Sequence, residues 1–124
     1  MTEDKALEIF KLALQKTAAG EMHWEQLDAS GFDEIYAHST AGGFSLRAYP
    51  HSYYAENDQG EGPPSLTLFD ASGKIVFDIT SELKGITEED LNQLYDRARV
   101  VALGIDDKLD LILKDLRSTP QGSE

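Results

Sequence analysis

Three histidines, His23, His38 and His51, lie among many acidic residues in the middle of this 124-residue chain. Imidazole and carboxylate groups together can bind zinc or transfer protons. A metal site needs at least three such groups to converge, and no helical spacing such as His-x-x-x-His forces that here. The chain also has no cysteine, so thiolate ligands are absent. We expect no metal or other cofactor, and keep as an alternative a small-ligand or metal-dependent enzyme that uses these histidines with nearby acids.

Other catalytic motifs are also missing from the sequence. There is no G-x-S-x-G elbow for a serine nucleophile and no G-x-x-x-x-G-K loop for phosphate. His51 and Ser52 are neighbours, so on an extended chain their side chains point to opposite faces. We therefore assign no catalytic residue and favour a protein that is not an enzyme.

The charge is strongly acidic, with 23 acids against 11 bases and a net charge of −12. Between Ala18 and Gly73 the only base is Arg47. Such a surface repels phosphate backbones, so we expect no nucleic-acid partner. An acidic surface can attract a basic protein. The second alternative function is therefore an acidic immunity protein, a chaperone or a nucleic-acid-mimic inhibitor of a basic protein. Type III secretion chaperones are similar in size and acidity, but usually place a helix within the strands, which is not indicated here.

The sequence indicates no membrane partner. Apolar residues near the N-terminus are spaced rather than continuous, and no window approaches the ~18 consecutive apolar residues of a membrane span. We expect a cytoplasmic protein, a location that the absence of cysteine also fits.

Tyrosines surround Pro50, at the start of an acidic stretch rich in glycine and proline. Proline has no N–H for a strand ladder, so the strand before it is expected to end there or to lie at an edge. Tyrosine combines apolar area with a polar tip, which suits protein recognition, although shielding of a sheet edge explains the cluster equally well. The candidate interaction residues are Tyr49, Tyr53, Tyr54, Glu56, Asp58 and Glu61.

The elements that position these residues follow from apolar periodicity. Spacing of three to four predicts a helix over residues 3–18, and spacing of two then predicts strands. Trp24 shares one face of the first strand with Met22, which favours a core anchor over an interface residue. Asp70-Ala-Ser-Gly73 has the composition of a short hairpin loop. The predicted strands span residues 22–27, 33–39, 44–49, 65–69 and 74–79.

Two further helices are expected at the C-terminal end. Thr87 and Asp90 nearly match a capping box, and Gly104 is placed to end the helix that Thr87 begins. A third helix from Asp106 carries an apolar side, and the pair is predicted to form an αα-hairpin packed on the sheet. That side comprises Leu109, Ile112, Leu113 and Leu116.

This order of elements predicts one two-layer α+β domain over residues 1–116, with a disordered tail over 117–124. It contains an N-terminal helix, an antiparallel sheet of about five strands and the C-terminal helix pair on one face of that sheet. The other face is expected to stay wet or to meet a second subunit. We expect a non-catalytic, acidic cytoplasmic module for binding or assembly through protein-protein contacts, with a homodimer as one form.

Overall fold

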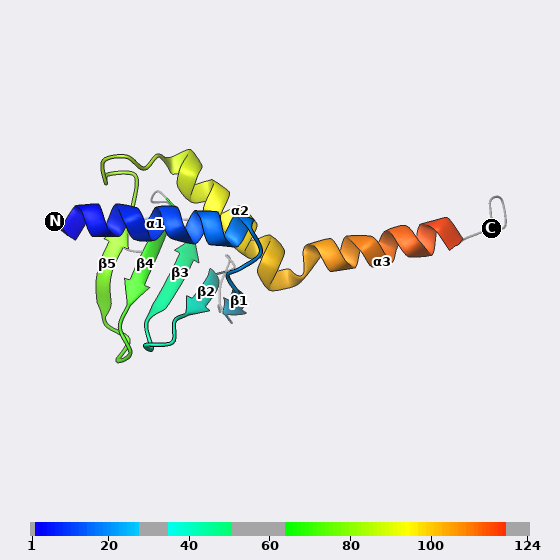
Figure 1. Cartoon of the computed structure of the whole chain (residues 1–124), viewed down its shortest axis with the longest axis horizontal. Coiled ribbons are helices and arrows are strands. Elements are labelled where there is room, and N and C mark those ends of the chain that lie inside the picture. The colour runs from blue at the N-terminus through cyan, green and yellow to red at the C-terminus, as the bar shows by residue number, and fades with distance from the viewer. Residues whose placement is uncertain (1, 28–34, 51–63, 119–124) are drawn as a thin grey trace, which may run out of the picture.

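A computed structural model describes residues 2–27, 35–50 and 64–118 and confirms the α+β class. An N-terminal helix precedes five strands, and two helices follow them (Figure 1). The elements are α1 (Thr2–Ala18), β1 (Glu25–Leu27), β2 (Ile35–Ser39), β3 (Ser45–Tyr49), β4 (Ser65–Phe69), β5 (Ile75–Ile79), α2 (Glu88–Leu103) and α3 (Ile105–Ser118).

The five strands form one antiparallel meander in the order β1-β2-β3-β4-β5. β3 is therefore the central strand. Of the two alternatives expected at Pro50, the edge position is wrong and the end of the strand is confirmed. The strand does end at Tyr49, immediately before the proline that could not continue the ladder. Pro50 lies just outside the paired residues of β3, so its missing N–H does not prevent the strand from pairing with both neighbours.

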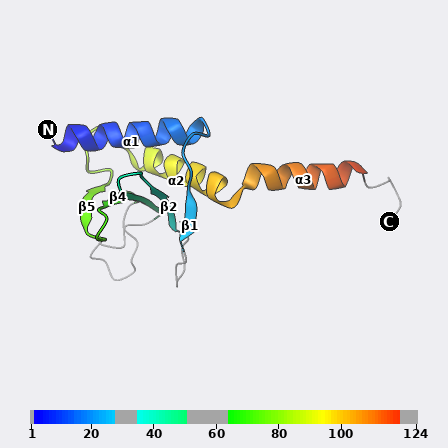
Figure 2. The ribbon, with the colours of Figure 1, turned by 60° about the horizontal axis from the view of Figure 1, so that its bottom comes forward.

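α1 and α2 lie on the same face of the sheet (Figures 1 and 2). Trp24, Tyr36 and Leu66 are completely buried there, together with Leu94 and Ala98 of α2, whose exposed fractions are at most 1%. The Trp24 Nε1–H group donates a hydrogen bond to Thr17 Oγ1 at 2.9 Å. The prediction that Trp24 is a core anchor is confirmed. Its hydrogen bond connects the residue that precedes β1 to the last turn of α1.

The opposite face of the sheet is less exposed than expected. Tyr49, Thr67 and Phe69 point away from the helix-side core and are nevertheless buried. The polar groups among them have partners, since Thr67 Oγ1 donates to Asp78 Oδ1 at 2.7 Å. The guanidinium of Arg47 lies 4.3 Å from the centre of the Phe69 ring, a cation–π contact. Of the two alternatives expected for this face, a wet surface is wrong at these positions, and contact with a second subunit stays a prediction.

α2 begins and ends where its capping residues predict. The Thr87 hydroxyl accepts from the Asp90 N–H at 3.1 Å, and the Asp90 carboxylate accepts from the Thr87 N–H at 3.0 Å. Gly104 follows the helix in the left-handed conformation, with φ of 60°, and its N–H bonds back to carbonyls of the last turn. The capping box and the glycine stop are both confirmed.

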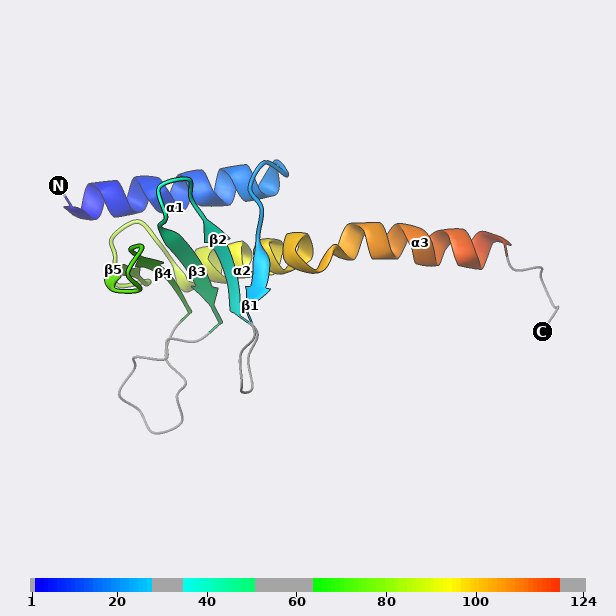
Figure 3. The same cartoon turned by 90° about the horizontal axis from the view of Figure 1, so that it is seen from below.

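α3 departs from the expected hairpin. Only Gly104 separates it from α2, whereas a reversal of direction between two helices needs a loop of about 2–5 residues. α3 consequently continues outward from the end of α2, away from the sheet, in all three views (Figures 1–3). None of its side chains is buried. It also includes Arg117 and Ser118, two residues that the sequence assigned to the tail.

The hairpin turn between β4 and β5 is built around Asp70, as predicted. Its carboxylate accepts from the Ser72 hydroxyl at 2.7 Å and from the backbone N–H groups of Lys74 and Ser72 at 2.9 Å each. Gly73 provides the positive φ, 88°, that closes the turn. These hydrogen bonds stabilise the charged carboxylate, so the pKa of Asp70 lies below its ordinary value of 3.8.

The buried hydrogen bond between Trp24 and Thr17 gives a test of the core. Thr17→Val leaves the indole N–H buried without an acceptor, and we expect it to lower the free energy of unfolding by about 1–3 kcal/mol. Thr17→Ser keeps the hydroxyl and should cost less. Urea unfolding of the three proteins measures the difference, and equal losses for both variants would contradict the assigned bond.

The Asp70 turn predicts a pH dependence. Because the folded-state pKa is lowered, the carboxylate stabilises the fold above its unfolded pKa, and this contribution is lost as the pH falls through the folded pKa. Asp70→Ala should therefore lower the melting temperature at neutral pH. The gap between wild type and variant should narrow below about pH 4. Thermal unfolding followed from pH 7 to pH 2.5 tests this, and a gap that does not change with pH would count against it.

Candidate functional site

The exposed large apolar side chains of the described residues gather in two places. One group lies between α1 and the ends of the strands next to the two hairpin turns, and the other lies along α3. Scattered apolar residues are normal on a protein surface, but contiguous groups mark places where something binds. The first group is Ile9, Leu12, Phe44 and Val76, and the second is Leu109, Leu111, Ile112, Leu113 and Leu116. Ile75 belongs to neither group, because it pairs with Phe69, whose side chain points away from α1.

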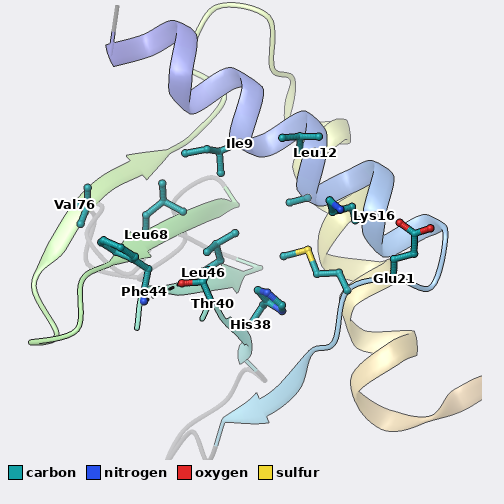
Figure 4. A pocket seen from close by; sticks show the side chains of 12 residues that line it. Ile9, Leu12, Lys16, Glu21, His38, Thr40, Phe44, Leu46, Leu68 and Val76 are labelled. Atoms are coloured by element: carbon teal, nitrogen blue, oxygen red, sulfur yellow. Dashed lines mark hydrogen bonds between the residues drawn. The ribbon is translucent and has the colours of Figure 1, made fainter. Parts of the chain in front are cut away.

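The first group surrounds a groove of about 610 Å³, named here the α1 groove (Figure 4). In Figure 1, α1 crosses the sheet near one end of the strands, and the two hairpin turns extend beyond it. Ile9 of α1 and Leu46 and Leu68 of the strands form its walls. The lining residues are Ile9, Leu12, Ala13, Lys16, Glu21, Met22, His38, Thr40, Phe44, Leu46, Leu68 and Val76.

His38 is the only histidine among the described residues that lines this groove. Its Nδ1 atom lies 2.6 Å from the backbone carbonyl oxygen of His23. A carbonyl oxygen only accepts, so Nδ1 is the donor of this hydrogen bond. The ring is also 6.0 Å from that of Trp24. Backbone and core contacts therefore hold His38 in place, as expected of a structural residue.

The side chain of His23 does not join His38. It is 74% exposed, and its Nε2 atom lies 3.4 Å from Glu25 Oε2. Across the described ranges no three His, Cys, Asp or Glu residues are placed to hold a metal ion. His51 lies outside these ranges. The two described histidines thus give no support to an enzyme that uses them together.

The second group makes the most exposed apolar surface of the described chain. Ile105, Leu109, Ile112, Leu113 and Leu116 recur at helical spacing and form what we call the α3 face. Four of them are between 43% and 66% exposed, and Ile105 is half-buried beside the end of α2. Leu111 is 61% exposed but projects from another side of the helix. The α3 face is thus the apolar side of an amphipathic helix, and no other element of the described structure covers it.

The candidate residues named from the sequence are placed differently. Tyr49 ends the central strand and is only 6% exposed, which leaves little of it for a partner. Tyr53, Tyr54, Glu56, Asp58 and Glu61 lie outside the described residues.

The sequence did reveal the apolar side of α3, but assigned it to packing on the sheet. The single residue between α2 and α3 was the signal that it could not fold back. The α1 groove had no comparable signal, because Ile9, Phe44 and Val76 come from distant segments.

Within the described parts of the chain, every helix is too short or too polar to cross a lipid bilayer. Comparison with protein-family models, with functionally described proteins and with solved structures finds no match to this chain. The two apolar surfaces and the charges beside them are therefore the features of the described chain that can indicate a function.

Proposed function

We propose that this protein is a non-catalytic module for binding or assembly, and that the α3 face is its protein-binding surface. The observation that carries the proposal is the exposure of four large aliphatic side chains on one side of a helix that projects from the domain. An amphipathic helix normally buries such a face. The described residues of the domain do not cover this face, which supports a partner protein as the group that buries it.

Covering this face contributes part of the free energy of binding a partner. Full burial of a leucine or isoleucine side chain contributes about 1.5–3 kcal/mol. Leu109, Ile112, Leu113 and Leu116 are each about half exposed, so a partner gains on the order of 3–6 kcal/mol from them before the cost of association. A partner would also stabilise α3 itself, because a 14-residue helix without tertiary contacts is only marginally stable in water.

The charges of α3 favour a protein over a membrane surface. Helices that lie in a membrane interface are usually rich in lysine and arginine on their polar side. α3 has more acids than bases, which disfavours contact with anionic lipid. Its charged residues are Asp106, Asp107, Lys108, Asp110, Lys114, Asp115 and Arg117.

The hypothesis of an acidic immunity protein, chaperone or nucleic-acid mimic stays a prediction. Of the nine acids between Ala18 and Gly73, only Glu21, Glu25 and Asp70 belong to the described residues. A cytoplasmic location is likewise part of the proposal, and the lack of cysteine supports it.

The proposed surface predicts a selective loss of binding. Ile112→Asp places a charge in the centre of the α3 face, whereas Leu111→Asp adds the same charge to an exposed leucine on another side of the helix. We expect the wild type and Leu111→Asp to bind the same partner proteins or to self-associate to the same extent. Ile112→Asp should neither bind those partners nor self-associate. Affinity capture and sedimentation of all three proteins provide the measurement. Identical behaviour of the three would refute the proposal.

A further inference from the structure

We infer that the α3 face pairs with α3 of a second copy of this chain, with the two helices antiparallel. The inference rests on the proposed function, because it takes the α3 face to be a protein-binding surface. What it adds is the identity and orientation of the partner. Three features carry it: the spacing of the apolar residues, the charges beside them and the direction in which α3 leaves the domain.

The apolar residues of α3 have the spacing of a two-helix seam. Ile105, Leu109, Ile112 and Leu116 follow one another at intervals of four, three and four residues. This alternation keeps side chains facing one partner helix, as the a and d positions of a coiled coil do. In that numbering Ile105 and Ile112 take d positions, and Leu109 and Leu116 take a positions.

An antiparallel arrangement brings an a position of one helix opposite a d position of the other. Leu109 then lies opposite Ile112 of the second copy, and Ile105 lies opposite Leu116 of the second copy. The twofold axis repeats both contacts, so four apolar layers extend from Ile105 to Leu116 of each helix, about 17 Å. Every layer contains one leucine and one isoleucine.

The charges beside the seam match this arrangement. Lys108 and Asp115 are both exposed and occupy the g positions next to the apolar residues. In an antiparallel pair g positions face each other across the seam, and the layers above place Lys108 opposite Asp115 of the second copy. The twofold axis produces this lysine–aspartate pair twice. On the other side of the seam Asp106 faces Leu113 of the second copy, so no like charges oppose each other.

A parallel pair lacks these contacts. Each g position then faces an e position further along the second helix, which brings Lys108 opposite Leu113 of that copy. Within the described residues, a parallel arrangement makes no lysine–aspartate pair. It would also bring both domains to the same end of the helix pair. Because α3 extends away from the domain (Figures 1 and 3), the antiparallel pair separates the two domains to opposite ends.

The α1 groove is a poorer receptor for α3 of a second copy. Its volume is about 610 Å³, whereas a helix of 14 residues, roughly 10 Å wide and 21 Å long, occupies ~1,600 Å³. The groove could hold only a few of its side chains. Pairing between two α3 helices covers the whole face and needs no change in the domain.

The interface is small, so the dimer should be weak and reversible, with a dissociation constant in the micromolar range or above. Sedimentation velocity over a concentration series of the full chain measures it. Leu109→Asp introduces a charge into two of the four layers, and we expect it to weaken dimerisation more than 100-fold. The matched control Leu111→Asp, which alters an equally exposed leucine off the seam, should dimerise like wild type. Helix content by circular dichroism checks that both variants stay folded.

A charge reversal tests the orientation. Lys108→Glu places two acids opposite each other, and Asp115→Lys places two lysines opposite each other, so each single variant should weaken dimerisation about tenfold. The double variant Lys108→Glu with Asp115→Lys restores opposite charges and should recover the wild-type constant. Because the two residues are two helical turns apart, this recovery requires contact between copies.

The outcomes separate this inference from the proposed function. A wild-type protein that stays monomeric at all concentrations, or dimers that Leu109→Asp leaves intact, would overturn the pairing of α3 helices. A double charge variant no better than the single ones would overturn the antiparallel arrangement. If the wild type is monomeric but still captures another protein that Ile112→Asp loses, the α3 face remains a binding surface and only its partner is different.

Discussion

The hydrogen bond between the Trp24 indole and the Thr17 hydroxyl is the contact on which the arrangement of the domain depends. Trp24 directly precedes β1 and is completely buried, so its N–H group must find an acceptor inside the protein. Thr17, in the last turn of α1, provides it. The helix is thereby held against the entry of the sheet, on the side that α2 also covers. The hairpin ends of the sheet remain beyond α1, and the α1 groove results.

The second constraint is the single glycine between α2 and α3. Gly104 adopts a left-handed conformation that ends α2, and α3 begins at the next residue. A break of this length changes the direction of the chain but does not reverse it. The apolar side of α3 consequently points to solvent in the described structure. The same residues that would complete the core of a helical hairpin therefore become a surface for another protein.

Much of the fold could be predicted because it depends on local chemistry. Thr87 and Asp90 cap α2 through groups three residues apart, and Asp70 bonds to the backbone of its own turn. Strand positions followed from β-type residues and from alternation of apolar and polar residues, although β1 begins at Glu25 and not at Met22. Predictions that required knowledge of distant neighbours were less successful. Pro50 correctly indicated the end of a strand, but not that this strand lies in the centre of the sheet. The candidate site shows the same division: the apolar side of α3 was visible in the sequence, and its exposure was not.

The sequence by itself determined the kinds of element, their caps and turns, and which residues of each helix share an apolar side. These properties arise from hydrogen bonds and spacings within a few residues, which any chain of this sequence carries. Only the tertiary structure decided which apolar sides are covered. Burial depends on the direction in which each element leaves its neighbour, and Gly104 directs α3 away from the domain. A helix that packs in a core and a helix that binds a partner look alike in sequence, because both need an apolar face.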